Sequence, residues 1–367
     1  MKKFAGVIVG LLGGAAVGYA VAKLFTGGEE AAATTEPLAL WLKVLLFLSL
    51  PLLMLFVIGV HELGHVAAGR WQGFRFFGLT VGPLAWRPDN DGRVRFERNR
   101  NLNLAGGVAI MLPEGEDNIR RRFSWFAAGG PLASLLLGLI ALLPLWLFDA
   151  PRFLGDLLLF TGILSAVIFL ATIVPFRSGG FASDGMRILT FWRGGPTAEA
   201  DLAALRTMAH LRAGRPYAAL PYEQLTAAAA DPAVADQQRT TLDYYRYLYL
   251  LDRGDVPAAV TLFDSVMDRL DQYPEGSQGG FYLERALLAA RYERDLPKAH
   301  AARDRYEPGP VVETYAPLLV DATIADLTED RAALDELLPA LEAALPRSID
   351  QTRATQVRGW IAEWKSV

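Results

Sequence analysis

The sequence predicts a mainly α-helical, polytopic membrane protein with about four transmembrane helices, a small membrane-associated β hairpin and a soluble α-helical, repeat-like domain. Three observations support this fold class. Long apolar segments are confined to the first half of the 367-residue chain. A stretch between two of these segments alternates apolar and polar residues, as strands do. After Pro196 the composition changes to alanine, leucine and charged residues with helical periodicity.

Four apolar segments approach the roughly 20 residues that a helix needs to cross a hydrocarbon core. They are residues 5–25, 38–66, 125–148 and 153–174. The first segment has glycine at Gly6 and at every fourth position up to Gly18, which favours a retained helix that packs closely against another. Lys2 and Lys3 before this segment are also typical of a cleavable signal peptide. That alternative leaves the later topology unchanged.

The distribution of lysine and arginine predicts the orientation in the membrane. Lys2 and Lys3 precede the first segment, residues 26–37 contain neither lysine nor arginine, and residues 70–122 contain ten arginines. The positive-inside rule therefore places both termini and the loop at residues 70–122 in the cytoplasm. His61 then lies near the cytoplasmic end of its helix.

Residues 73–111 differ from the helices around them. Their apolar residues suggest two short strands, joined by a turn at residues 88–92. One possible role is to bind an extended substrate by strand addition at a sheet edge. The other is a hairpin at the lipid surface, anchored by the arginines between Arg93 and Arg100. The sequence favours the two roles about equally.

His61, Glu62 and His65 follow directly after the apolar run at residues 44–60. On a helix, residues i and i+4 share one face, so both imidazoles can reach one metal ion with Glu62 beside it. The chain has only four histidines, and two of them stand at this spacing. Ionisable groups in a span are costly and typical of function. We therefore interpret the motif as a zinc site with Glu62 as general base, rather than as polar residues satisfied within a helix bundle.

A catalytic zinc site normally has three protein ligands and one open position. Asp184 follows another apolar segment, whereas His210 and His300 lie in the polar C-terminal region. Asp184 is therefore the better candidate for the third ligand. The alternative for Asp184 is a helix N-cap, because Ser183 and Asp184 precede an apolar helical pattern.

These pieces together resemble the site-2 protease family of intramembrane zinc metalloproteases. The resemblance covers residues 38 to about 193. Its ordered parts are the motif at residues 61–65, the strand-like stretch at 73–83, the stretch at 106–115, Gly130 with Pro131, and Asp184 with Gly185 and Arg187. It implies that Asp184 is the third zinc ligand.

The resemblance also implies a substrate-binding group, which comprises Gly130, Pro131, Ser134 and Thr172. Two of these positions depart from the family pattern. Ser134 stands where the family has asparagine after Gly-Pro, and Thr172 stands where an asparagine is common before Pro175. A hydroxyl reaches less far and makes fewer hydrogen bonds than an amide.

The resulting organisation has three parts: residues 1–37 as an N-terminal transmembrane helix and outer loop, 38–193 as a metalloprotease core, and 194–367 as a cytoplasmic helical domain. In that domain three similar segments place aspartates at Asp255, Asp295 and Asp330. Their spacing resembles tetratricopeptide-like helical hairpins, which form a binding surface. An irregular helical bundle is the alternative.

We expect an intramembrane zinc metalloendopeptidase that cleaves transmembrane segments of membrane-anchored regulatory proteins, such as an anti-sigma factor, in the inner membrane of a bacterium. Its expected partners are the membrane-protein substrate, the lipid bilayer and a cytoplasmic protein that binds residues 196–367. Without cysteine the chain has no disulfide or thiolate ligand. A formal net charge of −4 without a basic domain gives no reason to expect nucleic acid.

Two other classes of function compete with the enzyme. A noncatalytic membrane adaptor would use a structural metal site and recruit partners through the helical domain. A structural zinc site needs no glutamate beside a ligand, so Glu62 favours the enzyme. A metal transporter would need several polar residues along its spans, and Lys43 and Asp156 are isolated near the outer ends.

Overall fold

The computed structural model of the chain is mostly helical. It describes residues 39–88, 93–99, 106–115, 117–178, 181–273, 278–308 and 312–366. The chain divides into two compact units, and all described residues after Trp192 belong to the second. Each unit is considered by itself.

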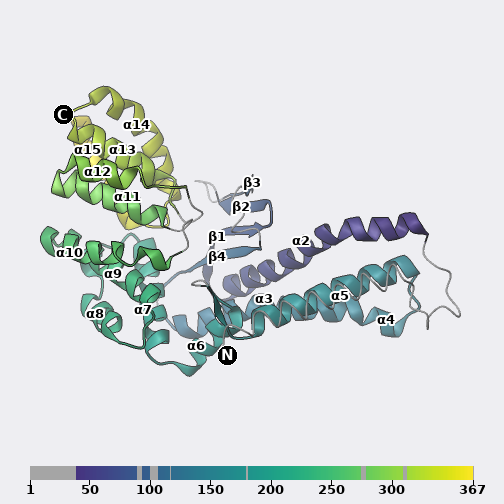
Figure 1. Ribbon diagram of the computed structural model, residues 1–367. Coiled ribbons are helices and arrows are strands. Elements are labelled where there is room, and N and C mark those ends of the chain that lie inside the picture. Colours follow the sequence, from purple (N-terminus) through teal and green to yellow (C-terminus); the bar gives the residue numbers. More distant parts are fainter. Residues whose placement is uncertain are drawn as a thin grey trace. The chain divides into compact units, whose positions relative to one another are not determined.

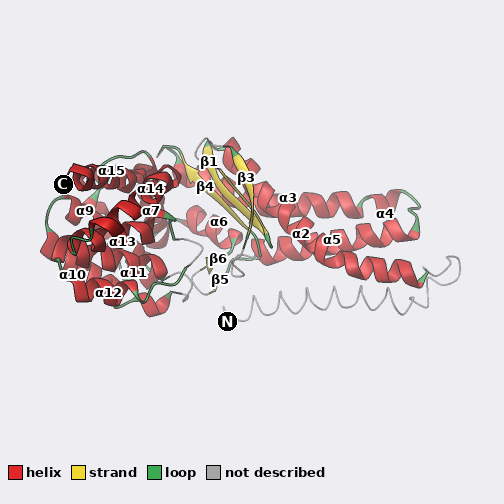
Figure 2. Cartoon of the chain, turned by 90° about the horizontal axis from the view of Figure 1, so that it is seen from above, coloured by secondary structure: helices red, strands yellow, loops and turns green. Residues whose placement is uncertain are grey.

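The first unit contains long apolar helices, which are α2 (Leu40–Trp71), α3 (Ile119–Leu142), the short α4 (Pro144–Leu147) and α5 (Arg152–Ile173). Figures 1 and 2 show α2, α3 and α5 running side by side. Among the described residues, three stretches are long and apolar enough to cross a membrane: Leu40–Trp71, Ile119–Leu147 and Arg152–Ile173. They match the second to fourth predicted spans. The predicted span at residues 5–25 lies outside the described residues.

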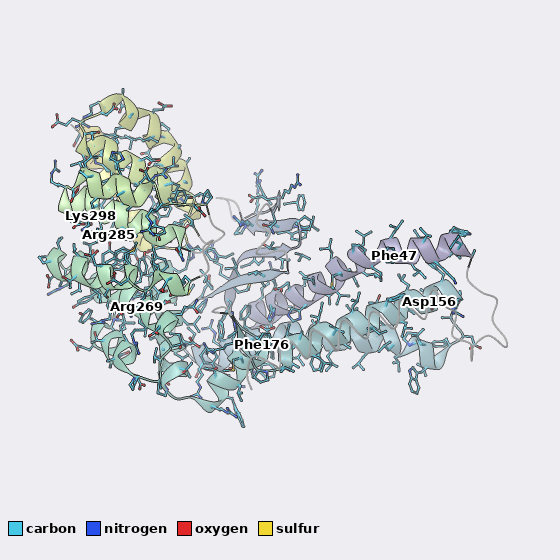
Figure 3. All side chains as sticks on the ribbon, in the orientation of Figure 1. Phe47, Asp156, Phe176, Arg269, Arg285 and Lys298 are labelled. Atoms are coloured by element: carbon cyan, nitrogen blue, oxygen red, sulfur yellow. The ribbon has the colours of Figure 1, made fainter. Side chains whose placement is uncertain are left out.

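The outer faces of these helices carry large apolar side chains. Phe47 on α2 is 51% exposed and Trp146 on α4 is 88% exposed, and Phe47 is labelled on its helix in Figure 3. Such continuous apolar surface is rare on soluble monomers. Helices whose whole length is this apolar fit a lipid environment.

Inside the first unit, glycines bring the helices together. A Cβ added to Gly64 on α2 would collide with the carbonyl of Gly129 on α3, and one added to Gly129 would collide with the carbonyl of Gly64. The two backbones therefore touch directly. Small residues at a helix crossing allow this close approach in membranes.

A four-stranded sheet follows α2. Its strands are β1 (Phe74–Val81), β2 (Leu84–Pro88), β3 (Val94–Arg98) and β4 (Val108–Pro113), in the order β3-β2-β1-β4. The β1–β2 and β2–β3 pairs are antiparallel. The sequence predicts two strands in this region, whereas the structure has four. Gly82, which has a positive φ of 55°, turns the chain between β1 and β2, before the turn that the sequence predicts at residues 88–92.

A short segment after α5 leads to the last helix of the first unit. Strands β5 (Arg177–Ser178) and β6 (Phe181–Ala182) pair with each other, and α6 (Asp184–Arg193) follows. Arg120 at the start of α3 donates hydrogen bonds to the carbonyls of Phe191 and Trp192 in α6. These bonds attach α6 to α3.

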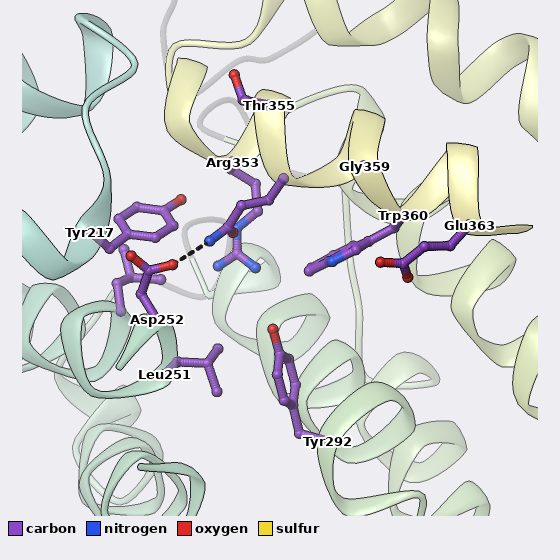
Figure 4. A pocket seen from close by; sticks show the side chains of 11 residues that line it. Tyr217, Leu251, Asp252, Tyr292, Arg353, Thr355, Gly359, Trp360 and Glu363 are labelled. Carbon is purple, nitrogen blue, oxygen red and sulfur yellow. Dashed lines mark hydrogen bonds between the residues drawn. The ribbon is translucent and has the colours of Figure 1, made fainter. Parts of the chain in front are cut away.

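The second unit is built from helices. They are α7 (Pro196–Arg212), α8 (Tyr222–Ala230), α9 (Asp236–Asp252), α10 (Val256–Met267), α11 (Gly279–Leu288), α12 (Leu296–Arg303), α13 (Tyr315–Leu327), α14 (Arg331–Ala344) and α15 (Gln351–Ser366). One apolar core surrounds Tyr247 and Phe263, and another surrounds Leu338 and Trp360. A pocket of about 350 Å³ lies within this unit, with Tyr217, Tyr292 and Trp360 in its walls (Figure 4).

The three similar segments of the sequence share one local structure. In each, an aspartate caps a helix by accepting a hydrogen bond from the main-chain N–H three residues later: Asp255 from Ala258, Asp295 from Lys298, and Asp330 from Ala333. The residue before each aspartate has positive φ: Gly254 at 78°, Arg294 at 53° and Glu329 at 58°. The same capped turn therefore occurs three times, each time before a new helix.

Candidate metal centre

Two histidines of α2 face each other across one helical turn. His61 and His65 are both buried, and their Nε2 atoms lie 3.2 Å apart. The ring planes meet at 84°. The i, i+4 spacing of the motif thus places both Nε2 atoms on the same side of the helix, as the sequence predicts.

Asp184, the first residue of α6, completes a group of three possible metal ligands. Its Oδ2 lies 3.3 Å from Nε2 of His61 and 3.3 Å from Nε2 of His65. Burial raises the pKa of Asp184, but hydrogen bonds and charge from the two imidazoles outweigh this effect and lower the pKa below its usual value. The side chain is therefore a carboxylate at neutral pH, which is the form that binds metal.

The helix cap before α6 is formed by Ser183 and not by Asp184. The Oγ of Ser183 accepts hydrogen bonds from the main-chain N–H groups of Met186 and Phe176, and it donates one to the carbonyl of Val174. Since a neighbouring residue satisfies the helix start, the carboxylate of Asp184 is free to face the imidazoles. The N-cap alternative for Asp184 is therefore wrong.

The spacing of these donor atoms fits a zinc ion. Two atoms bound to one tetrahedral zinc at about 2.0–2.1 Å lie about 3.3 Å from each other. The three separations among His61, His65 and Asp184 are 3.2, 3.3 and 3.3 Å. Two nitrogens and one carboxylate oxygen are also ligands that zinc accepts, with a fourth position left for water or substrate.

Gly130 on α3 keeps the space beside the imidazoles open. A Cβ added to Gly130 would lie 2.6 Å from Nε2 of His61 and would collide with Nε2 of His65. Any side chain here would thus occupy the space that a metal needs. Gly130 was predicted to bind substrate, and the structure places it against the ligand atoms themselves.

Each imidazole also makes a polar contact through Nδ1, the ring nitrogen that does not face Asp184. Nδ1 of His65 lies 2.8 Å from the carbonyl oxygen of Phe126, and Nδ1 of His61 lies 2.9 Å from Oγ of Ser134. A carbonyl only accepts hydrogen bonds, so Nδ1 of His65 must donate and Nε2 is left with a free lone pair. Such outer hydrogen bonds orient the metal-binding histidines of proteins.

Glu62 is buried beside the histidines. It is 8% exposed, and the main-chain N–H of Ala109 in β4 hydrogen-bonds to it. Gly107, with a φ of 110°, passes so close that an added Cβ would lie 2.8 Å from Oε1 of Glu62. The start of β4 therefore holds the glutamate next to the candidate metal site.

The remaining predicted substrate-binding residues lie on α3 and α5. Pro131 lies inside α3 rather than at its start, because the helix begins twelve residues earlier, at Ile119. Thr172 uses its hydroxyl within its own helix, donating to the carbonyls of Ile168 and Phe169. Ser134 has no exposed surface.

The other two histidines take no part in this group. Nε2 of His210 lies 2.8 Å from the carbonyl of Pro216, and His300 is an exposed residue of α12. The sequence does not predict the contacts that Phe126 and Gly107 make with His65 and Glu62. Phe126 acts through its main chain, which leaves no signal in residue type, whereas Gly107 lies in the stretch at residues 106–115 that the resemblance includes.

Comparison with known protein families identifies a match over most of the chain. The model of peptidase family M50 matches residues 49–350, which is most of the chain. No curated protein and no solved structure matches.

Proposed function

The chain belongs to peptidase family M50, and we propose that it is an intramembrane zinc metalloendopeptidase that cleaves transmembrane segments of membrane-anchored regulatory proteins. Members of this family are zinc metalloproteases of membranes. The observation that carries the proposal is the convergence of His61, His65 and Asp184, at separations that fit zinc, inside a group of apolar helices.

We assign the metal ligands to His61, His65 and Asp184. Zinc bound there would supply Lewis-acid activation of a water molecule and of the scissile carbonyl. Asp184 contributes its negative charge, and the two outer hydrogen bonds fix the direction of the imidazoles.

Glu62 is the proposed general base. Its carboxylate would accept a proton from the attacking water and then donate a proton to the nitrogen of the leaving amine. The contact with the main chain of Ala109 restricts where that carboxylate can point. Proton transfer requires a base within hydrogen-bond reach of the water, so this restriction serves the reaction.

We propose that substrate enters as an extended strand along the sheet. A helical substrate must unwind before a peptide bond becomes accessible, and a sheet edge can hold the unwound backbone by main-chain hydrogen bonds. Both β3 and β4 are edge strands of the described sheet.

Pro131 and Thr172 remain proposed substrate contacts. The exposed Val94 and Phe96 of β3 also support the alternative of a hairpin at the lipid surface.

For the helical domain at residues 194–367 we propose a cytoplasmic, tetratricopeptide-like module that binds a protein partner through residues 196–367. The three equivalent capped turns support a repeated hairpin. We also propose that the enzyme lies in the inner membrane of a bacterium and that both termini are on the cytoplasmic side. The alternative is a noncatalytic adaptor with a structural metal site, and the position of Glu62 beside the ligands supports the enzyme instead.

The test is cleavage of a model transmembrane substrate by purified protein in detergent, together with measurement of zinc content. We expect wild type to cut, Glu62→Gln to keep zinc without cutting, and Asp184→Ala to lose both zinc and cleavage. His300→Ala is the matched control, because this exposed histidine lies outside the site and its loss should change neither property. Zinc in wild type and in Glu62→Gln, with equal cleavage by both, would contradict the role of Glu62. Zinc without cleavage of any substrate in wild type would favour the adaptor.

A further inference from the structure

The family resemblance implies that Ser134 contacts substrate, but in the structure Ser134 is buried against His61. Its side chain is 0% exposed. Its Oγ lies 2.9 Å from Nδ1 of His61, on the side of the imidazole away from Asp184. A residue with no accessible surface has nothing to offer a substrate directly.

Ser134 and Gly130 lie one helical turn apart on α3, so both face the histidines of α2. Gly130 leaves room beside the Nε2 atoms, where the metal would bind. Ser134 reaches the opposite nitrogen of His61. One face of α3 thus contacts the imidazoles at both of their ring nitrogens.

The two histidines are held by different kinds of group. His65 is held by the carbonyl of Phe126, which can only accept a hydrogen bond. His61 is held by a hydroxyl, which can accept or donate. A metal at Nε2 requires the proton of His61 to reside on Nδ1, and Ser134 must then act as the acceptor.

We infer that Ser134 is a positioning residue that orients His61 for metal binding by accepting a hydrogen bond from its Nδ1, and that it is not a substrate-binding residue. This inference rests on the proposed zinc site. Without the hydroxyl, Nδ1–H of His61 would be left in a fully buried place without a partner, which is costly. Loss of such an outer partner typically lowers metal affinity by about 10–100-fold.

The experiment measures zinc affinity by competition with a chelator on the full-length protein in detergent. Ser134→Ala is compared with Ser165→Ala. Ser165 is the matched control because it is also 0% exposed in a membrane helix, but it donates its hydrogen bond to the carbonyl of Thr161 and not to a histidine. We expect Ser134→Ala to bind zinc about 10–100-fold more weakly, and Ser165→Ala to bind it as wild type does.

Ser134→Thr and Ser134→Val separate the hydroxyl from packing, since threonine and valine have nearly the same shape. We expect the threonine variant, which keeps the hydroxyl that accepts from Nδ1 of His61, to bind zinc more tightly than the valine variant. Equal zinc affinity in these two variants would overturn the role of Ser134, as would an equal loss of affinity in Ser165→Ala.

The same experiment distinguishes this inference from the proposed function. A wild-type protein that takes up no zinc would contradict the zinc site itself, and with it the role of Ser134. Tight zinc binding by wild type and by Ser134→Val alike would leave the protease proposal standing and would contradict only the positioning role.

Discussion

Gly64 of α2 and Gly129 of α3 touch backbone to backbone, because the Cβ that either residue lacks would collide with the carbonyl of the other. Gly64 lies next to His65, and Gly129 lies next to Gly130. The crossing point of the two helices is thus also the point at which α3 meets the metal ligands. Helix packing and metal geometry therefore depend on the same contact.

We predict that Gly129→Ala separates α2 from α3 and disturbs the site. Overpacking of this kind typically costs about 1–3 kcal/mol. The measurements are thermal unfolding and zinc content. Gly138→Ala is the control on the same helix, because its Cβ would meet its nearest neighbour, Cβ of Ser165, at an ordinary 3.5 Å. If Gly129→Ala keeps the unfolding temperature and zinc of Gly138→Ala, the close crossing is not required.

Gly130→Ala should act on the metal more than on the fold. Its methyl group would occupy the space beside Nε2 of His61 and His65, so we predict a purified protein with little or no bound zinc. Zinc content by atomic spectroscopy tests this, with Gly138→Ala again as control. Stoichiometric zinc in Gly130→Ala would show that the metal lies elsewhere.

The capped turns of the helical domain predict a local effect on stability. Asp330→Ala removes the acceptor for the N–H of Ala333, and loss of an N-cap costs about 0.5–2 kcal/mol. Asp335→Ala is the control, since Asp335 is an exposed residue inside the same helix. Denaturant unfolding of the two variants measures the difference. Equal stability would mean that the bond of Asp330 contributes nothing.

A buried ion pair in the second unit predicts a much larger effect. Arg353, seen beside the pocket in Figure 4, donates to Glu284 at 2.6 Å, and both side chains are largely buried. Arg353→Met would leave the carboxylate of Glu284 without its cation, which typically costs about 3–5 kcal/mol. The double variant Arg353→Met with Glu284→Leu should recover part of that loss.

An exposed pair supplies the comparison. Lys365 and Glu342 lie 2.7 Å apart with both side chains about half exposed, and such pairs contribute about 0–1 kcal/mol. We therefore expect Lys365→Met to change unfolding by denaturant far less than Arg353→Met does. Similar losses in the two variants would argue that burial of the Arg353 pair is unimportant.

Features that arise between residues close together in the chain could be predicted from the sequence. The i, i+4 spacing fixes His61 and His65 on one helix face, and repeated aspartates mark the capped turns. Apolar length marks three of the four predicted spans, and these three lie within the described residues. These depend on the helical period, on local hydrogen bonds and on the apolar character of a segment, and all of these can be read along the chain.

Contacts between groups that are distant in the chain were revealed by the folded structure. It placed Asp184 between the imidazoles while Ser183 took the helix cap, and it placed Ser134 and the carbonyl of Phe126 behind the two rings. The physical reason is that these contacts depend on how closely α2, α3 and α6 pack, which glycines without side chains permit. Residue type alone states what a group can bind, whereas packing decides which partner lies within reach.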